Sequence, residues 1–173
     1  MSKHVFLIGF MGSGKTHWGR VVARALSHPF IDLDEWIETQ EGKSILQIFS
    51  DAGESDFRAL EKQYLHRMKG LEPSVIATGG GTPCFFDNLA WMQKEGVVIY
   101  LKTSPEILFR RLKAERESRP LLASLDEAQL PDIIRERLYA RTPVYERADH
   151  VLEQSDDDAA FLQQLLDLIR TSF

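Results

Sequence analysis

The chain has 173 residues, of which 43% are hydrophobic and 27% are charged, a balance typical of a globular protein that buries one core. Its formal net charge of −5 makes nucleic acid and anionic membranes poor partners, so an anionic substrate must meet a local basic pocket. Cys84 is the only cysteine, which excludes an intrachain disulfide, and no apolar run reaches the about 18 residues of a membrane span.

Short apolar runs and amphipathic segments alternate along the first half of the chain. The alternation predicts, in chain order, a strand at 5–8, a helix over about 15–26, and strands at 30–34 and 75–78. Before the last of these strands, Ser44 and Gln47 form a capping-box pattern that opens a short helix, which Gly53 ends. A longer helix follows, with apolar residues from Phe57 to Met68 along one side.

The second half continues the alternation. It predicts a helix from Asp87 to Glu95, a strand at 97–101, a helix that Ser104 and Pro105 open, a strand at 150–152, and a C-terminal helix over about 161–169. Residues 113–124 are charged and show little periodicity, and we expect a mobile lid there. Ser124 and Glu127 then cap a helical region that runs toward Tyr145, with Pro131 as a break or a restart.

This alternation predicts an α/β protein. We expect a three-layer fold in one domain over residues 1–173, with a five-stranded parallel sheet flanked by helices. Ligands of such sheets bind beyond the carboxyl ends of the strands, where glycine clusters occur at 12–14 and 79–81. The four residues before the first strand are too few for a signal peptide, so we expect a cytoplasmic location; we also expect a monomer.

The segment from Gly9 to Thr16 matches the phosphate-binding pattern G-x-x-x-x-G-K-[ST] in full. Glycines allow several backbone N–H groups to point at one anion, and the following helix N-terminus adds partial positive charge. Lys15 supplies a full charge to the β- and γ-phosphates, and the Thr16 hydroxyl is a ligand for Mg²⁺. A chance glycine turn is the alternative, but the strand before it and the helix after it favour a nucleotide-phosphate site. The predicted nucleotide contacts in this segment are Gly12, Ser13, Gly14, Lys15 and Thr16.

Five further segments restrict the type of reaction that this nucleotide site could serve. They are Ile31–Asp34, Phe57-Arg58, Thr78–Gly81, Arg119–Leu122 and Arg141–Tyr145. In this order and spacing, the set closely resembles the shikimate kinase family, and the resemblance covers about residues 5–147. It implies transfer of the γ-phosphate of ATP, with Mg²⁺, to the 3-hydroxyl of shikimate in aromatic amino-acid (chorismate) biosynthesis. The products would be shikimate 3-phosphate and ADP.

The resemblance also implies roles for the residues that surround the reacting groups. Lys15 and Thr16 would hold phosphate and Mg²⁺, and Asp32 would bind Mg²⁺ through water. Asp34 would contact the ring hydroxyls and is the candidate base at the 3-hydroxyl. Arg119 would close with the lid and contact both ATP and the transferring phosphate, which makes Lys15, Asp34 and Arg119 the expected catalytic residues.

A substrate-binding segment is expected at about residues 33–62. The full set of shikimate contacts that the resemblance implies is Asp34, Phe49, Phe57, Arg58, Gly79, Gly80, Gly81 and Arg141. Two arginines suit a carboxylate, because each guanidinium offers a planar two-point fork, and a backbone N–H near Gly80 or Gly81 would assist. Glu54 and Glu61 flank Arg58 at i−4 and i+3, a spacing that would hold its fork in place.

Several assignments stay open. The sequence after the fifth strand, 153–158, is unusually acidic for a nucleotide loop, so no adenine contact is assigned, and a cap for the last helix is its alternative role. Arg111 or Arg116 is a candidate second nucleotide contact, although Arg111 also fits a solvated helix face. Asp32 and Asp34 also fit helix caps, and Arg141 fits a helix-end cation.

Other functions share parts of the pattern. A gluconate or nucleoside monophosphate kinase would use the same phosphate cradle and a lid, but a monophosphate kinase needs a base-reading pocket that the sequence does not locate. A regulatory module with a degenerate kinase fold would be expected to lack Lys15, Asp34 or Arg119, and all three are present. A GTPase-type switch is disfavoured because the sequence has no N-K-x-D motif.

Overall fold

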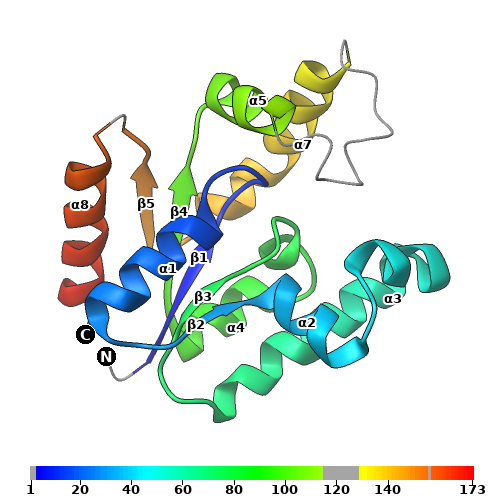
Figure 1. Cartoon of the computed structure of the whole chain (residues 1–173), viewed down its shortest axis with the longest axis horizontal. Coiled ribbons are helices and arrows are strands. Elements are labelled where there is room, and N and C mark those ends of the chain that lie inside the picture. Colours follow the sequence, from blue (N-terminus) through cyan, green and yellow to red (C-terminus); the bar gives the residue numbers. More distant parts are fainter. Residues whose placement is uncertain (1–2, 115–128, 156) are drawn as a thin grey trace.

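The computed structural model describes residues 3–114, 129–155 and 157–173, and its core is one parallel sheet (Figure 1). The strands are β1 (His4–Ile8), β2 (Phe30–Asp32), β3 (Val75–Ala77), β4 (Gly96–Lys102) and β5 (His150–Glu153). They pair in the order β2-β3-β1-β4-β5, and every pairing is parallel. The predicted five-stranded parallel sheet is therefore confirmed.

Helices cover both faces of the sheet (Figure 1). They are α1 (Lys15–Leu26), α2 (Leu33–Glu41), α3 (Ile45–Arg67), α4 (Asn88–Glu95), α5 (Pro105–Ala114), α7 (Leu130–Tyr145) and α8 (Asp158–Thr171), with short 3₁₀ turns η1 (Met68–Gly70) and η2 (Thr82–Cys84). Side chains alternate along β1, so that Val5 and Leu7 pack with α1 and α8, whereas Phe6 and Ile8 pack with α2, α3, α4, α5 and α7. The three-layer prediction is thus confirmed, and no helix among the described residues could cross a membrane.

The register of the central strands brings three chain segments to one edge of the sheet. Leu7 of β1 and Asp32 of β2 both lie opposite Ala77 of β3. The residues that follow these strands are the phosphate-binding segment, the start of α2 and the glycine segment 79–81, so all three emerge together at the carboxyl edge.

The predicted second strand was too long. The structure ends β2 at Asp32 and begins α2 at Leu33, because one carboxylate oxygen of Asp32 accepts hydrogen bonds from the backbone N–H groups of Asp34 and Glu35. The sequence offered Asp32 and Asp34 as possible caps of a helix here but did not predict the bounds of α2. Its buried positions are Leu33 and Ile37, too few to give a clear apolar periodicity.

The structure also decides four predicted helix boundaries. The capping box at Ser44 is present, and Gly53, with φ 82° and ψ 176°, breaks the helical path of α3. Asp87 precedes α4 without a side-chain cap, because its carboxylate instead accepts from Lys62 at 2.6 Å. Pro131 stands in the first turn of α7, so it starts that helix. Of the predicted lid, 113–124, all but the first two residues lie outside the described residues.

Gly19 allows α1 to approach the sheet closely. A Cβ atom at this position would lie 2.4 Å from Cε2 of the Phe30 ring. Replacing a helix glycine with alanine alone stabilises by about 1 kcal/mol, but we expect Gly19→Ala to cost a net ~1–3 kcal/mol through overpacking. Urea unfolding measures this change in the free energy of unfolding. Gly70→Ala is the control: its Cβ would meet nothing within 4 Å. If both variants are equally stable, the close approach of α1 carries no energetic cost.

Candidate active site

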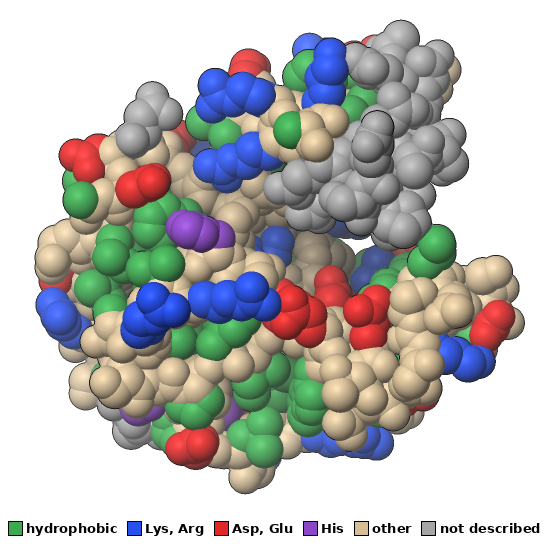
Figure 2. Space-filling model, in the orientation of Figure 1, with side chains coloured by type: hydrophobic (Ala, Val, Ile, Leu, Met, Phe, Trp, Pro, Cys, Tyr) green, Lys and Arg blue, Asp and Glu red, His purple; other side chains and the backbone are tan. Residues whose placement is uncertain are grey.

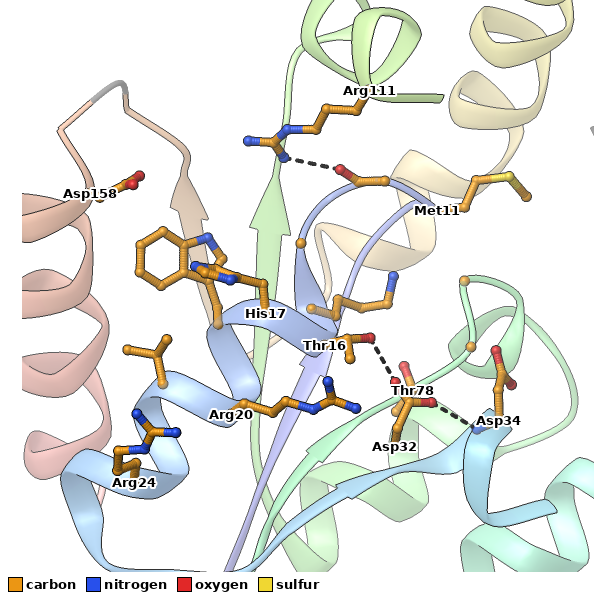
Figure 3. Close-up of a pocket in the computed structure, with 17 residues that line it drawn as sticks. Met11, Thr16, His17, Arg20, Arg24, Asp32, Asp34, Thr78, Arg111 and Asp158 are labelled. Atoms are coloured by element: carbon orange, nitrogen blue, oxygen red, sulfur yellow. Dashed lines mark hydrogen bonds between the residues drawn. The ribbon is translucent and has the colours of Figure 1, made fainter. Parts of the chain in front are cut away.

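A cavity of about 810 Å³ opens at the carboxyl edge of the sheet (Figure 3). Its walls come from the phosphate-binding segment 9–16, the first turns of α1, the β2–α2 junction and residues 78–80, with Arg111 of α5 and Asp158 of α8 at its margin. Figure 2 shows the hollow on this face, with basic and acidic side chains around it. The cavity therefore lies where the sheet topology predicts a ligand.

The phosphate-binding segment has the backbone of an anion cradle. Gly12 and Gly14 both have φ near 81°, a left-handed conformation that glycine adopts without strain. The turn is closed by a hydrogen bond from the Ser13 N–H to the Phe10 carbonyl, and α1 begins immediately after Gly14. The backbone thus leads directly into a helix N-terminus, where unpaired N–H groups favour an anion.

Lys15 and Thr16 stand at the start of α1, as predicted. The Lys15 ammonium is largely buried and donates to the carbonyl groups of Gly9 and Phe10, at 2.9 and 3.0 Å. The Thr16 hydroxyl donates to Asp32 Oδ2 at 2.7 Å (Figure 3). Since the other oxygen of Asp32 caps α2, both interpretations of this aspartate, helix cap and site residue, fit the structure.

Asp34 lies in the cavity on the first turn of α2. Desolvation, followed by the nearby charges of Glu61 and Asp32, raises the pKa of its carboxyl group from 3.8 to about 7. The cations of Lys15 and Arg58 oppose this rise. The geometry therefore places a carboxyl group that titrates near neutrality beside the phosphate cradle.

Arg58 is held by the two glutamates that flank it on α3. It donates to Glu61 Oε2 and to Glu54 Oε1, both at 3.2 Å. Glu61 is fully buried and also accepts from the Thr82 hydroxyl at 2.5 Å. Burial raises the pKa of Glu61, while the hydrogen bond from Thr82 and the Arg58 charge lower it. The expectation that these glutamates hold the guanidinium is confirmed for both.

Aromatic rings surround the same guanidinium. Phe49 and Phe57 are in ring contact, with centroids 4.4 Å apart. The Arg58 Cζ lies 5.7 Å from the Phe49 centroid and 5.1 Å from that of Phe57, and a third ring, Phe85, lies closer at 4.4 Å. Phe85 was not among the predicted site residues, because it follows the short turn η2 and belongs to no motif in the sequence. These rings leave the guanidinium few positions, so they fix its direction.

Positions 79 and 81 of the glycine segment leave no room for a side chain, whereas a Cβ at position 80 would make an ordinary contact. An added Cβ would lie 2.8 Å from Glu61 Oε1 at Gly79 and 2.7 Å from Arg58 Nη2 at Gly81. At Gly80, the atom would meet Arg141 Nη1 at 3.4 Å. The glycines therefore bring the backbone against both arginines that the sequence singled out.

Arg141 comes from α7 and reaches the same glycine segment. Its Cζ lies 5.7 Å from the centroid of Phe10, beside the phosphate-binding segment. Arg141 and Arg58 thus approach the glycine segment from two different helices. Arg119 and Arg116 lie outside the described residues, so their predicted contacts stay predictions.

Arg111 belongs to the cavity, and its interpretation as a solvated helix residue was wrong. Its guanidinium donates to the Gly12 carbonyl at 3.0 Å (Figure 3). It also donates to Gln154 Oε1 at 2.9 Å. Gln154 in turn donates to the Ser13 carbonyl at 2.6 Å. The acidic stretch after β5 has a structural use, because Asp157 caps α8 by accepting from a backbone N–H.

Known proteins with the same sequence pattern and fold are kinases. A family model described as shikimate kinase matches residues 11–170. A shikimate kinase of Phocaeicola vulgatus is 43% identical over 167 residues, which cover 96% of this chain and 95% of the relative. The crystal structure of shikimate kinase from Bacteroides thetaiotaomicron superposes with a TM-score of 0.92 at 38% identity, covering 97% of this chain and 98% of that one. The structure of shikimate kinase from Acinetobacter baumannii in complex with shikimate superposes with a TM-score of 0.88 at 33% identity, covering 98% of this chain and 93% of that one.

The raised pKa of Asp34 predicts a pH-dependent stability. Between pH 4 and 7 the folded state holds a proton on Asp34 that the unfolded state releases, so stability falls as pH rises through this window. Asp34→Asn removes the titration and mimics the protonated form. We expect it to stabilise the protein by about 2–4 kcal/mol at pH 8 and by little below pH 4.

Urea unfolding at several pH values, with EDTA and without nucleotide, measures this difference. Asp51→Asn, at an exposed aspartate on α3, is the control and should show no such gain at pH 8. If the wild-type protein is as stable as the Asp34→Asn variant at pH 8, the ionised Asp34 carboxylate does not destabilise the folded state and the prediction is wrong.

Proposed function

We infer the roles of the pocket residues from one premise, which the sequence and structural relatives establish: the chain belongs to the shikimate kinase family. The enzyme transfers the γ-phosphate of ATP to the 3-hydroxyl of shikimate, which gives shikimate 3-phosphate and ADP. Membership of this family argues against gluconate and nucleoside monophosphates as the acceptor. It also argues against the two other functions considered, a regulatory module with a degenerate kinase fold and a GTPase-type switch.

One observation carries the assignment of roles: the phosphate cradle and the Asp34 carboxyl group line the same cavity. Phosphoryl transfer needs the donor phosphate and the acceptor hydroxyl in line and shielded from water. The cradle at the start of α1 would hold the donor phosphate. Asp34, on the neighbouring β2–α2 junction, would hold the acceptor hydroxyl.

Asp34 is proposed as the general base. A pKa of about 7 suits this task, because such a carboxyl group is partly ionised at neutral pH and still basic enough to take a proton. One of its oxygens accepts the proton of the 3-hydroxyl as that hydroxyl oxygen bonds to the γ-phosphorus. The bond between the γ-phosphorus and the β,γ-bridging oxygen breaks, and ADP leaves with both electrons. Asp34 then returns its proton to solvent.

Thr16 and Asp32 are proposed to hold Mg²⁺. A hydroxyl and a carboxylate that already share a hydrogen bond of 2.7 Å fit the hard oxygen donors that this ion prefers. When bound with ATP, the ion supplies positive charge to the β- and γ-phosphate oxygens. Lys15 adds the second positive charge at the cradle. Arg111, which already contacts the Gly12 carbonyl, is proposed as a nucleotide contact.

The carboxylate of shikimate is proposed to lie between Arg58 and Arg141, near the glycine segment 79–81. The two guanidinium groups approach this segment from α3 and α7, an arrangement suited to a two-sided clamp. Phe49 and Phe57 would line the apolar side of the ring. Arg119 is proposed to close over the phosphate, and the substrate-binding segment is proposed to lie within about residues 33–62. The enzyme is proposed to be a cytoplasmic monomer.

ADP release in a coupled assay with Mg²⁺-ATP, with and without shikimate, tests the reaction. We expect turnover that depends on shikimate and exceeds hydrolysis in its absence by a large factor, since an excluded-water site favours the alcohol. Gluconate and nucleoside monophosphates serve as the comparison panel. Equal turnover with one of these acceptors would overturn the assignment of the acceptor.

Asp34→Asn tests the base. The substitution keeps the size of the side chain but removes its basicity, so we expect turnover to fall by at least 10²-fold, the usual contribution of a general base. ATP affinity should be unchanged, which a binding titration measures. The Asp51→Asn variant should retain full turnover. Wild-type turnover in Asp34→Asn would remove this residue from the mechanism.

Arg141→Ala tests the clamp. Loss of one partner of a buried, charged hydrogen bond costs about 2–5 kcal/mol, so the KM for shikimate should rise by at least about tenfold while the KM for ATP stays the same. Arg135→Ala, an exposed arginine paired with Asp132 on the same helix, is the matched control. A shikimate KM within about twofold of wild type would argue against the clamp.

A further inference from the structure

The carbonyl groups of the glycine segment 79–81 all accept hydrogen bonds from the protein. The outer two accept from the backbone N–H groups of Thr82 and Cys84, at 3.2 and 2.8 Å. The middle carbonyl, that of Gly80, accepts instead from a side chain, the hydroxyl of Tyr145, at 2.5 Å. One side chain from α7 thus holds the centre of this segment.

The bond at the Gly80 carbonyl also sets the direction of the next N–H group. The Gly80 oxygen and the Gly81 N–H belong to one planar trans peptide, in which they point in opposite directions. A donor that fixes the carbonyl on the α7 side therefore turns the N–H away from α7. Hydrogen bonding at the carbonyl also polarises the N–H and makes it a better donor. Gly81 itself lies against the Arg58 guanidinium.

Tyr145 is built into the core as a fixed donor. It is fully buried, and its ring lies 5.0 Å from the ring of Tyr100. Desolvation raises the pKa of its hydroxyl, against the opposing charge of Arg141, so the group keeps its proton at any physiological pH. Tyr145 follows Arg141 by four residues, one turn along α7, which places both side chains on the same face of that helix.

We propose that Tyr145 is a positioning residue for shikimate, whose hydroxyl orients the Gly80–Gly81 peptide so that the Gly81 N–H meets the carboxylate together with Arg141. The inference rests on the proposed clamp and extends it. Helix α7 then supplies both the cation and the support for the backbone donor, and the two stay in register because they share one turn of helix. Tyr145 acts through Gly81 and does not touch the substrate.

Tyr145→Phe is the decisive variant, because it removes one oxygen atom and keeps the ring in the core. We expect the KM for shikimate to rise by about fivefold or more, with kcat within about twofold and the KM for ATP unchanged. Tyr100→Phe is the matched control, the same chemical change in the neighbouring ring. It should leave the KM for shikimate within about twofold.

Four outcomes would overturn the proposal. A lower melting temperature with an unchanged KM for shikimate would make Tyr145 a structural residue only. An equal rise in the KM for ATP, or an equal effect of Tyr100→Phe, would show a general loosening of the fold. If the variant does not fold, the wild-type protein labelled with ¹⁵N-glycine gives the answer: shikimate should shift the Gly81 amide proton, and an unchanged resonance overturns the role.

Arg141→Ala, measured in parallel, separates this inference from the clamp on which it rests. A raised KM for shikimate in Arg141→Ala, with a wild-type value in Tyr145→Phe, would overturn the role of Tyr145 and leave the clamp standing. Wild-type values in both variants would overturn the two together.

Discussion

The buried ion pair between Arg58 and Glu61 supports the acceptor side of the cavity. Their side chains are only 10% and 1% exposed, so both charges have lost most of their hydration, a cost that one contact between them does not offset. The remaining stabilisation comes from the Thr82 hydroxyl on Glu61 and from the aromatic rings around Arg58. The pair thereby joins α3 to η2, and the glycine segment between β3 and η2 takes its position from both.

Local signals in the sequence were sufficient for the sheet, the phosphate cradle and part of the acceptor cluster. Continuous apolar runs marked the buried strands, and the cradle is defined by eight consecutive residues whose geometry depends little on the rest of the chain. The glutamates beside Arg58 could also be predicted, because spacings of three and four residues on a helix decide which side chains meet.

Contacts that depend on tertiary packing could not be read in this way. Arg111 and Gln154 are 43 residues apart, and each alone resembles a surface residue. Helix α2 received no predicted bounds, because the predicted strand at 30–34 already covered its first two residues and Asp32 was only one possible cap. The hydrogen bond from the Tyr145 hydroxyl to the Gly80 carbonyl joins residues 65 positions apart, and no periodic pattern in the sequence indicates it. Such contacts follow from the fold and are visible only once it is assembled.

The crowding around the glycine segment limits how this enzyme can escape a drug. Side chains at positions 79 and 81 would collide with Glu61 and Arg58, groups that the site itself needs. An inhibitor anchored on the backbone of this segment would therefore bind atoms that mutation cannot alter without damaging the enzyme. Resistance would have to arise elsewhere in the pocket, and the selection of resistant variants would map which of its walls are dispensable.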